Sequence, residues 1–126
     1  MISLRENDTN PKKGMIINMK FSAVSEKLDL KLITGGVPDE FDGVYAGDLL
    51  SRAMSHVEAG NLWITIMSNV NVIAVASLAE AAAVILAEGV ELPDDVKAAA
   101  EEKEITVFSS EMTVYEICAG IASASA

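Results

Sequence analysis

The hydrophobic pattern in the middle of the chain predicts a strand, a helix and a second strand in succession. Leu62–Met67 is a short apolar run rich in β-branched and aromatic residues, and Ser68-Asn69 interrupts it. Val70–Ala81 is apolar on nearly every side and is expected to be a covered helix, and Ala82–Leu86 is a second apolar run. Segments that are apolar on both faces are typical of strands in the centre of a parallel sheet.

Similar patterns on either side extend this alternation. They predict further strands at Leu30–Ile33, Gly43–Ala46 and Ile105–Phe108, and helices over 22–28, 48–57, 94–103 and 113–122. Asp48 is expected to cap the second of these helices. One face of that helix should be buried, because it carries the i, i+3, i+4 spacing of Leu49, Leu50, Ala53, Met54 and Val57. The alternation predicts an α/β fold with about five mostly parallel strands and helices on both faces.

The 126 residues are predicted to hold one domain over 19–122, with a flexible leader at 1–18 and a frayed tail at 123–126. Thr113 and Glu116 match a capping box at the start of the last helix. The leader lacks the apolar core of a secretion signal. Glu80 and two asparagines interrupt the one apolar segment of near membrane-span length. We therefore expect a cytoplasmic protein that does not enter the membrane.

Composition excludes several classes of function. The formal net charge is −10, and no basic stripe compensates for it, which argues against binding to nucleic acid. Cys118 is the single cysteine and His56 the single histidine, so neither a disulfide framework nor a zinc site of Cys and His is expected. The acidic clusters lack the spacing of a calcium loop. No metal or other cofactor is predicted.

Three segments together resemble a known family. Gly60–Thr65, Asn71–Ala76 and Val84–Leu86 are similar to the small stand-alone DRTGG-domain proteins of bacteria, over roughly 19–121. Related domains stand at the N-terminus of the HPr kinase/phosphorylase, within long phosphotransacetylases and beside CBS domains in a regulated pyrophosphatase. The resemblance implies the fold of the HPr kinase N-terminal domain, no catalytic role, and a regulatory or assembly module that often forms homodimers.

Thr34, Gly35 and Gly36 match the last three letters of the family name, but no Asp-Arg pair precedes them. Whether Asp48 and Arg52 are dispersed counterparts stays open. A glycine pair at a strand end allows an anion to approach backbone amides, and it equally makes an ordinary tight turn. Because the segment lacks the pattern of a P-loop, the structural turn is the favoured interpretation.

Further candidates for a ligand site follow the ends of two predicted strands. Thr65, Ser68, Asn69 and Asn71 surround the end of one strand, and Ser109 and Ser110 follow another. Ligands of open α/β sheets gather at such ends. Asn69 is equally explained as a helix cap, and Asn71 is expected to need a partner because its helix is so apolar. If Ser68, Asn69 and Ser109 face one crevice, they form a neutral pocket without a cation, which suits a nucleoside or a small polar metabolite.

These observations favour a non-catalytic regulatory module that forms a homodimer and senses a small ligand such as a nucleotide. No catalytic residues are predicted. One alternative is an enzyme acting on an acyl or phosphoryl metabolite, with His56 or Asp48 handling the proton. Another is a purely structural partner of a larger cytoplasmic enzyme or signalling kinase.

Overall fold

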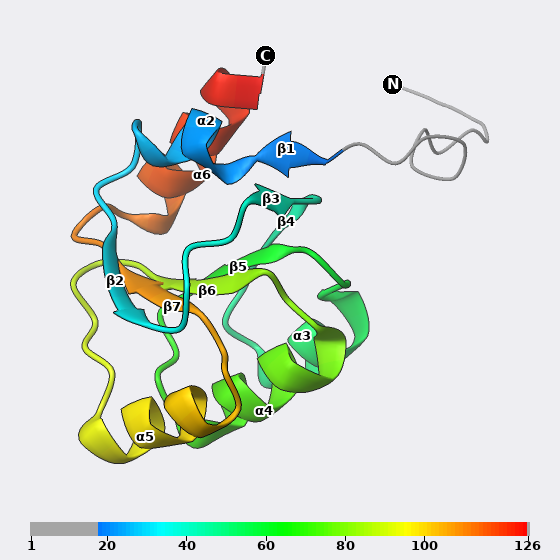
Figure 1. Ribbon diagram of the computed structural model, residues 1–126, viewed down its shortest axis with the longest axis vertical. Helices are drawn as coiled ribbons and strands as arrows, with labels where there is room; N and C mark the ends of the chain where they lie inside the picture. The colour runs from blue at the N-terminus through cyan, green and yellow to red at the C-terminus, as the bar shows by residue number, and fades with distance from the viewer. Residues whose placement is uncertain (1–17, 126) are drawn as a thin grey trace.

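The computed structural model of the protein describes residues 18–125, so the predictions for 1–17 and for 126 lie outside it. Its main sheet has five strands in the order β2-β7-β6-β5-β4 (Figure 1). The strands are β2 (Lys31–Thr34), β4 (Val44–Ala46), β5 (Leu62–Thr65), β6 (Ala83–Leu86) and β7 (Val107–Ser109). All neighbours pair in parallel except β2, which runs antiparallel to β7. The predicted α/β class and mostly parallel sheet are confirmed.

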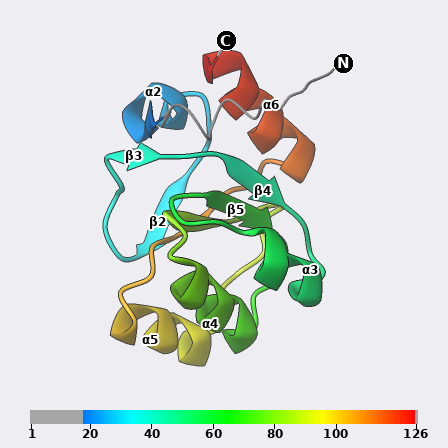
Figure 2. The ribbon, with the colours of Figure 1, turned by 90° about the vertical axis from the view of Figure 1, so that its right-hand side faces the viewer.

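Within residues 18–125, five helices cover the sheet on both faces (Figures 1 and 2). They are α2 (Phe21–Ser25), α3 (Leu50–His56), α4 (Val70–Ala79), α5 (Asp94–Glu102) and α6 (Val114–Ser125). The helices α3, α4 and α5 each connect two neighbouring parallel strands. Because such crossovers are right-handed, all three lie on the same face. The opposite face is covered by α2 and α6.

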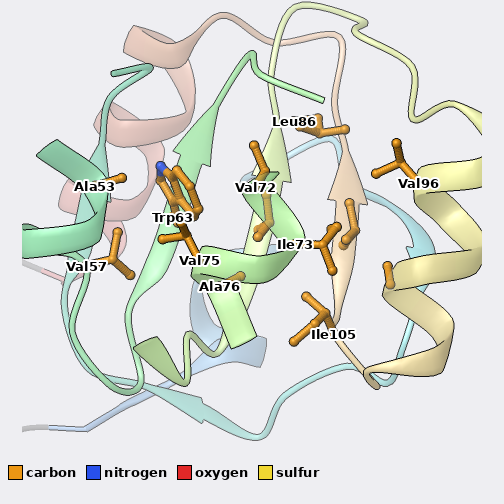
Figure 3. Close-up of a cluster of buried hydrophobic side chains, with 13 residues drawn as sticks. Ala53, Val57, Trp63, Val72, Ile73, Val75, Ala76, Leu86, Val96 and Ile105 are labelled. Carbon is orange, nitrogen blue, oxygen red and sulfur yellow. The ribbon is translucent and has the colours of Figure 1, made fainter. Parts of the chain in front are cut away.

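Each face of the sheet has its own hydrophobic core, because successive side chains of a strand point to opposite faces. Trp63 belongs to the core under α3, α4 and α5, whose side chains converge on the sheet in Figure 3. Leu62 and Ile64 belong to the core under α2 and α6. This division explains why all four residues of β5 are buried.

A second, small sheet was not predicted. β1 (Met19–Lys20) pairs antiparallel with β3 (Glu40–Phe41), in a segment interpreted from its acidic residues as a turn. Phe41 is buried there, with its ring 6.5 Å from that of Phe21 in an edge-on arrangement. The aromatic contact therefore draws this segment onto the core despite its charged neighbours.

The prediction of a buried face on α3 is wrong at two positions. Leu49 and Met54 are each 62% exposed, whereas Ala53 and Val57 are buried. Asp48 does not cap this helix, because the N-cap position is Leu49 and makes no side-chain hydrogen bond. The helix has only seven residues and lies over the edge of the sheet, so only its inner side meets the core.

The expectation that the helix from Val70 is covered on every side is also wrong. Val70 is 52% and Leu78 82% exposed, and Ala74 between them is exposed as well. A helix on one face of a sheet has an outer side that no further layer covers within the described chain. The boundaries differ slightly elsewhere: α2 begins one residue before Ser22 and ends at Ser25, and α6 runs on to Ser125.

Candidate functional site

The candidate residues lie at the two opposite ends of the strands in the main sheet. Because β2 is antiparallel to β7, the end of β2 places Thr34 beside the start of β7. The Thr34 hydroxyl donates to the carbonyl oxygen of Ile105 at 2.7 Å, and the Thr106 hydroxyl donates to that of Gly36 at 2.7 Å. Gly35 has φ +74°, and a Cβ atom there would lie 2.6 to 2.9 Å from atoms of Thr106. This arrangement accounts for Thr34, Gly35 and Gly36 as a structural turn.

Asp48 and Thr65 lie together at the opposite end of the sheet, where the parallel strands have their carboxyl ends. One carboxylate oxygen of Asp48 accepts hydrogen bonds from the Thr65 hydroxyl at 2.8 Å and from the Ile66 amide at 3.0 Å. The Met67 amide in turn donates to the Thr65 hydroxyl at 3.1 Å. Asp48 therefore joins the β4–α3 loop to the end of β5, and its acceptor oxygen is engaged by the protein itself.

Asn69 caps α4, as one interpretation of the sequence had it. Its side-chain oxygen accepts from the amides of Asn71 at 3.0 Å and Val72 at 3.3 Å. Asn71 itself is exposed, so burial does not oblige it to find a partner within the fold, and a partner in a second subunit or a ligand stays a prediction. Ser68 is half-buried in the same loop.

Ser68 lies just after β5, and Ser109 is the last residue of β7. Both therefore lie at the carboxyl ends of the parallel strands. Thr65 is in register with Leu86, and Leu86 with Ser109, so Thr65 and Ser109 are separated by the width of β6. Two strand spacings amount to about 10 Å. Trp63 and Val84 are register partners on the adjacent strands β5 and β6. The polar residues at the end of β5 and those at the end of β7 thus lie on the same side of the molecule without direct contact.

A cavity of about 310 Å³ opens at the carboxyl ends of the parallel strands, beside β7. The chain leaves β6 toward α5 on one face and leaves β7 toward α6 on the other. Crevices of open α/β sheets form where neighbouring connections diverge in this way. The cavity is lined by Lys31, Ile33, Gly89, Val90, Glu91, Leu92, Asp94, Lys97, Ser109 and Glu111. A smaller cavity of about 180 Å³ shares Lys31, Ser109 and Glu111 and adds Asp29 and Ser110. We call the two cavities together the strand-end crevice.

The loops that form the crevice are fixed by backbone hydrogen bonds. The Glu88 amide donates to Met112 at 2.8 Å, and the Gly89 amide donates to Ser110 at 2.9 Å. Glu88 and Gly89 both have positive φ, and the Val90 amide donates back to the carbonyl of Ala87, as in a type I′ turn. The divergent loops are therefore held together at their base.

The strand-end crevice is charged, and it is lined by Ser109 but not by Ser68 or Asn69, so it is a different pocket from the neutral one expected of these three residues. Lys31 and Lys97 line it together with Glu91, Asp94 and Glu111. Ammonium groups bind phosphate or carboxylate oxygens, and carboxylates accept hydrogen bonds from amino and hydroxyl groups. Lys31 cannot be assigned to the crevice from sequence, because the antiparallel pairing that sets it opposite Ser109 leaves no local pattern. Lys97 follows one turn after Asp94, and its sequence neighbours indicate only a helix.

The residues with catalytic potential lie elsewhere. His56 is exposed on α3, with Nδ1 2.8 Å from the carbonyl oxygen of Arg52 and its ring stacked on Tyr45 at 5.9 Å. Cys118 is half-buried on α6, and burial raises the pKa of its thiol, which disfavours the reactive thiolate. Neither residue lines the strand-end crevice. Within residues 18–125, no three potential metal-binding side chains are grouped together.

A larger hollow of about 520 Å³ lies between α2 and the segment that leads into β3. It is lined by Lys20, Phe21, Ser22, Ser25, Val37, Pro38, Asp39 and Glu40, and it contains none of the candidate residues. It does not lie at the carboxyl ends of the parallel strands, where a binding site is expected because the loops diverge.

Among the described helices, none is long and apolar enough to cross a membrane.

The fold is an α/β domain with a charged cavity at the carboxyl ends of its parallel strands. The sequence model of the DRTGG domain family matches residues 24–124, so the chain belongs to that family. A solved structure with the same fold contains the CBS and DRTGG domains of the regulatory region of Clostridium perfringens pyrophosphatase, in complex with its activator diadenosine tetraphosphate. The TM-score is 0.69 and the identity 13%, over 83% of this chain and 46% of that one. This chain therefore spans less than half of its structural neighbour. Comparison with curated proteins gives no match.

Proposed function

We propose that this domain is a non-catalytic regulatory module that binds a small anionic metabolite, with a nucleotide as the leading candidate, in the strand-end crevice. Membership in the DRTGG domain family supports the regulatory role. The structural neighbour supports the choice of ligand, because it is a regulatory region in complex with a nucleotide activator. A cytoplasmic location, the domain limits of 19–122 and a homodimer belong to the same proposal.

The observation that carries the proposal is a cavity at the divergent loops that is lined by two lysines and a serine, together with three acidic residues. Lys31 and Lys97 supply positive charge for a phosphate, and Ser109 supplies a hydroxyl. Glu91 and Glu111 provide acceptors for the amino group of a base or the hydroxyls of a ribose. The cavity of about 310 Å³ is at the lower end of the range for small-molecule sites, roughly 300–1,000 Å³, which favours a mononucleotide-sized group.

The alternative of an enzyme is less well supported. It requires His56 or Asp48 in one cleft with an anion-binding group. Asp48 instead accepts hydrogen bonds from Thr65 and Ile66, and neither His56 nor Asp48 lines the crevice. The alternative of a purely structural partner predicts that no metabolite binds.

Isothermal titration with adenine and guanine mono-, di- and triphosphates tests the proposal. We expect at least one nucleotide to bind, and Lys31→Gln and Lys97→Gln each to weaken that binding about tenfold or more, because each removes a charge-assisted hydrogen bond. Lys103→Gln is the matched control, since Lys103 is exposed at the end of α5 and outside the crevice. If none of the nucleotides binds, or if all three variants bind equally well, the ligand site proposed here is wrong.

A further inference from the structure

Met112 is hydrogen-bonded to three of the segments that form the strand-end crevice. Its carbonyl oxygen accepts from the Glu88 amide at 2.8 Å, and its own amide donates to the Ser110 hydroxyl oxygen at 3.1 Å. Its thioether sulfur accepts from the Asp29 amide at 3.2 Å. Asp29, Ser110 and Gly89, the residue after Glu88, line the crevice. Met112 itself lines neither cavity, so any effect it has on the crevice passes through its neighbours.

The bond to the thioether holds the segment that carries Lys31. Within residues 18–125, β2 is an edge strand that pairs with β7 alone (Figure 1). Its register shifts between Leu32 and Thr34, so the regular ladder that fixes the start of this strand is short. Asp29 lies two residues before Lys31, and its amide bond to the sulfur is a further anchor at that end.

We propose that Met112 is a positioning residue of the crevice. Through the Asp29 amide, its thioether sets the place of Lys31 relative to the loops that follow β6 and β7. Lys97 does not depend on this anchor, because it belongs to the nine-residue helix α5. The two lysines of the crevice are therefore held independently, one by a helix and the other by an edge strand with a thioether contact at its start.

Met112→Leu separates the hydrogen bond from the packing of this side chain. Met112 is half-buried against the core under α2 and α6, and leucine has a similar volume, so the midpoint of urea unfolding should change little. The variant lacks the acceptor for the Asp29 amide. For the tightest-binding of the adenine and guanine nucleotides, we expect the dissociation constant to rise about threefold, as for one weak hydrogen bond. Met54→Leu is the matched control, since Met54 is 62% exposed and lies outside the crevice.

A double-mutant cycle shows whether the effect passes through Lys31. Combined with Lys31→Gln, Met112→Leu should weaken nucleotide binding no further, because the ammonium group that it positions is gone. Combined with Lys97→Gln, it should still weaken binding about threefold. If the effects of Met112→Leu and Lys31→Gln multiply as those of independent sites do, Met112 does not position Lys31.

Oxidation of the sulfur tests the same contact in the unchanged sequence. Hydrogen peroxide transfers one oxygen atom to the thioether while its O–O bond breaks, which leaves the sulfoxide and water. The sulfoxide is polar and bulkier, so it should disturb the contact with the Asp29 amide and weaken nucleotide binding about threefold or more. Methionine sulfoxide reductase should restore binding. Peroxide should not change the affinity of Met112→Leu, and an equal loss in both chains would overturn the role of Met112.

The ligand in these tests rests on the proposed function, whereas amide hydrogen exchange tests the anchor without a ligand. Met112→Leu should speed exchange of the Asp29 amide and leave that of the Thr113 amide, which donates to Glu116, unchanged. If no nucleotide binds to any chain, the proposed function is wrong, and the anchor is judged by exchange at Asp29. If the Asp29 amide exchanges equally fast in both chains, Met112 does not hold this segment, whatever the crevice binds.

Discussion

Asp48 illustrates how a single residue is used differently from its most common local role. An acidic residue just before a helix is a typical N-cap, and the sequence predicts that role. In the fold, however, the end of β5 brings the Thr65 hydroxyl and the Ile66 amide to one oxygen of Asp48. Thr65 is fully buried, so its hydroxyl needs an acceptor more than an exposed helix end does. The tertiary contact therefore prevails over the cap.

Gly35 is the residue at which backbone conformation and space both demand glycine. Gly35→Ala should lower the free energy of unfolding by roughly 2 kcal/mol or more, because a side chain at positive φ costs about 1–2 kcal/mol and its Cβ would also displace Thr106. Gly36→Ala is the matched control, since a Cβ there meets nothing within 4 Å. Urea unfolding of both variants checks this prediction, and equal stabilities would contradict the account of the turn.

At the scale of secondary-structure elements, two helix N-terminal caps could be predicted from the sequence. Thr113 and Glu116 form the predicted capping box: the Thr113 amide donates to the Glu116 carboxylate at 2.9 Å, and the Glu116 amide donates to the Thr113 hydroxyl at 3.1 Å. Asn69 caps α4 in the way expected of an asparagine before an apolar run. Both caps involve residues within three positions of each other, so local sequence is sufficient to predict them.

The cap of α4 provides a test with an internal control. Asn69→Ala should lower the free energy of unfolding by about 1 kcal/mol, because two amides of the first turn lose their acceptor. Asn71→Ala, two residues further on and exposed, should be neutral or slightly stabilising, because alanine is the better helix former. Thermal unfolding followed by circular dichroism measures both. A larger loss for Asn71→Ala would mean that Asn71 has the structural partner that the sequence first suggested.

Several features that the sequence did not predict depend on pairing between distant segments. The apolar runs located the central strands β5 and β6 to within two residues, because burial on both faces leaves a continuous pattern. The antiparallel pairing of β2 with β7 left no such signal, and with it Lys31 of the crevice was missed. The exposed side of α4 could not be predicted either, because an apolar helix has the same sequence pattern whether its outer side is covered or exposed.

At the scale of the whole molecule, one sheet separates two hydrophobic cores that share no helix. Trp63, the single tryptophan, is buried in the core under α3, α4 and α5, and its ring nitrogen donates to the Gly47 carbonyl at 3.1 Å. Ile117 of α6 is fully buried in the opposite core. The three central strands β5, β6 and β7 each contribute side chains to both cores, so neither core is complete without strands that the other also stabilises. The two layers are therefore expected to unfold together.

Ile117→Ala tests this coupling from one core to the other. Truncating a fully buried isoleucine should cost about 2–5 kcal/mol, through lost burial and the cavity left behind. Because the sheet is shared, the denaturant midpoint from Trp63 fluorescence should fall as far as the midpoint from circular dichroism, as in a two-state transition. Comparing the two probes on the variant makes the measurement. If Trp63 kept its original midpoint while part of the helical signal was lost earlier, the layer of α2 and α6 would unfold separately, and the fold would consist of two units joined at a sheet.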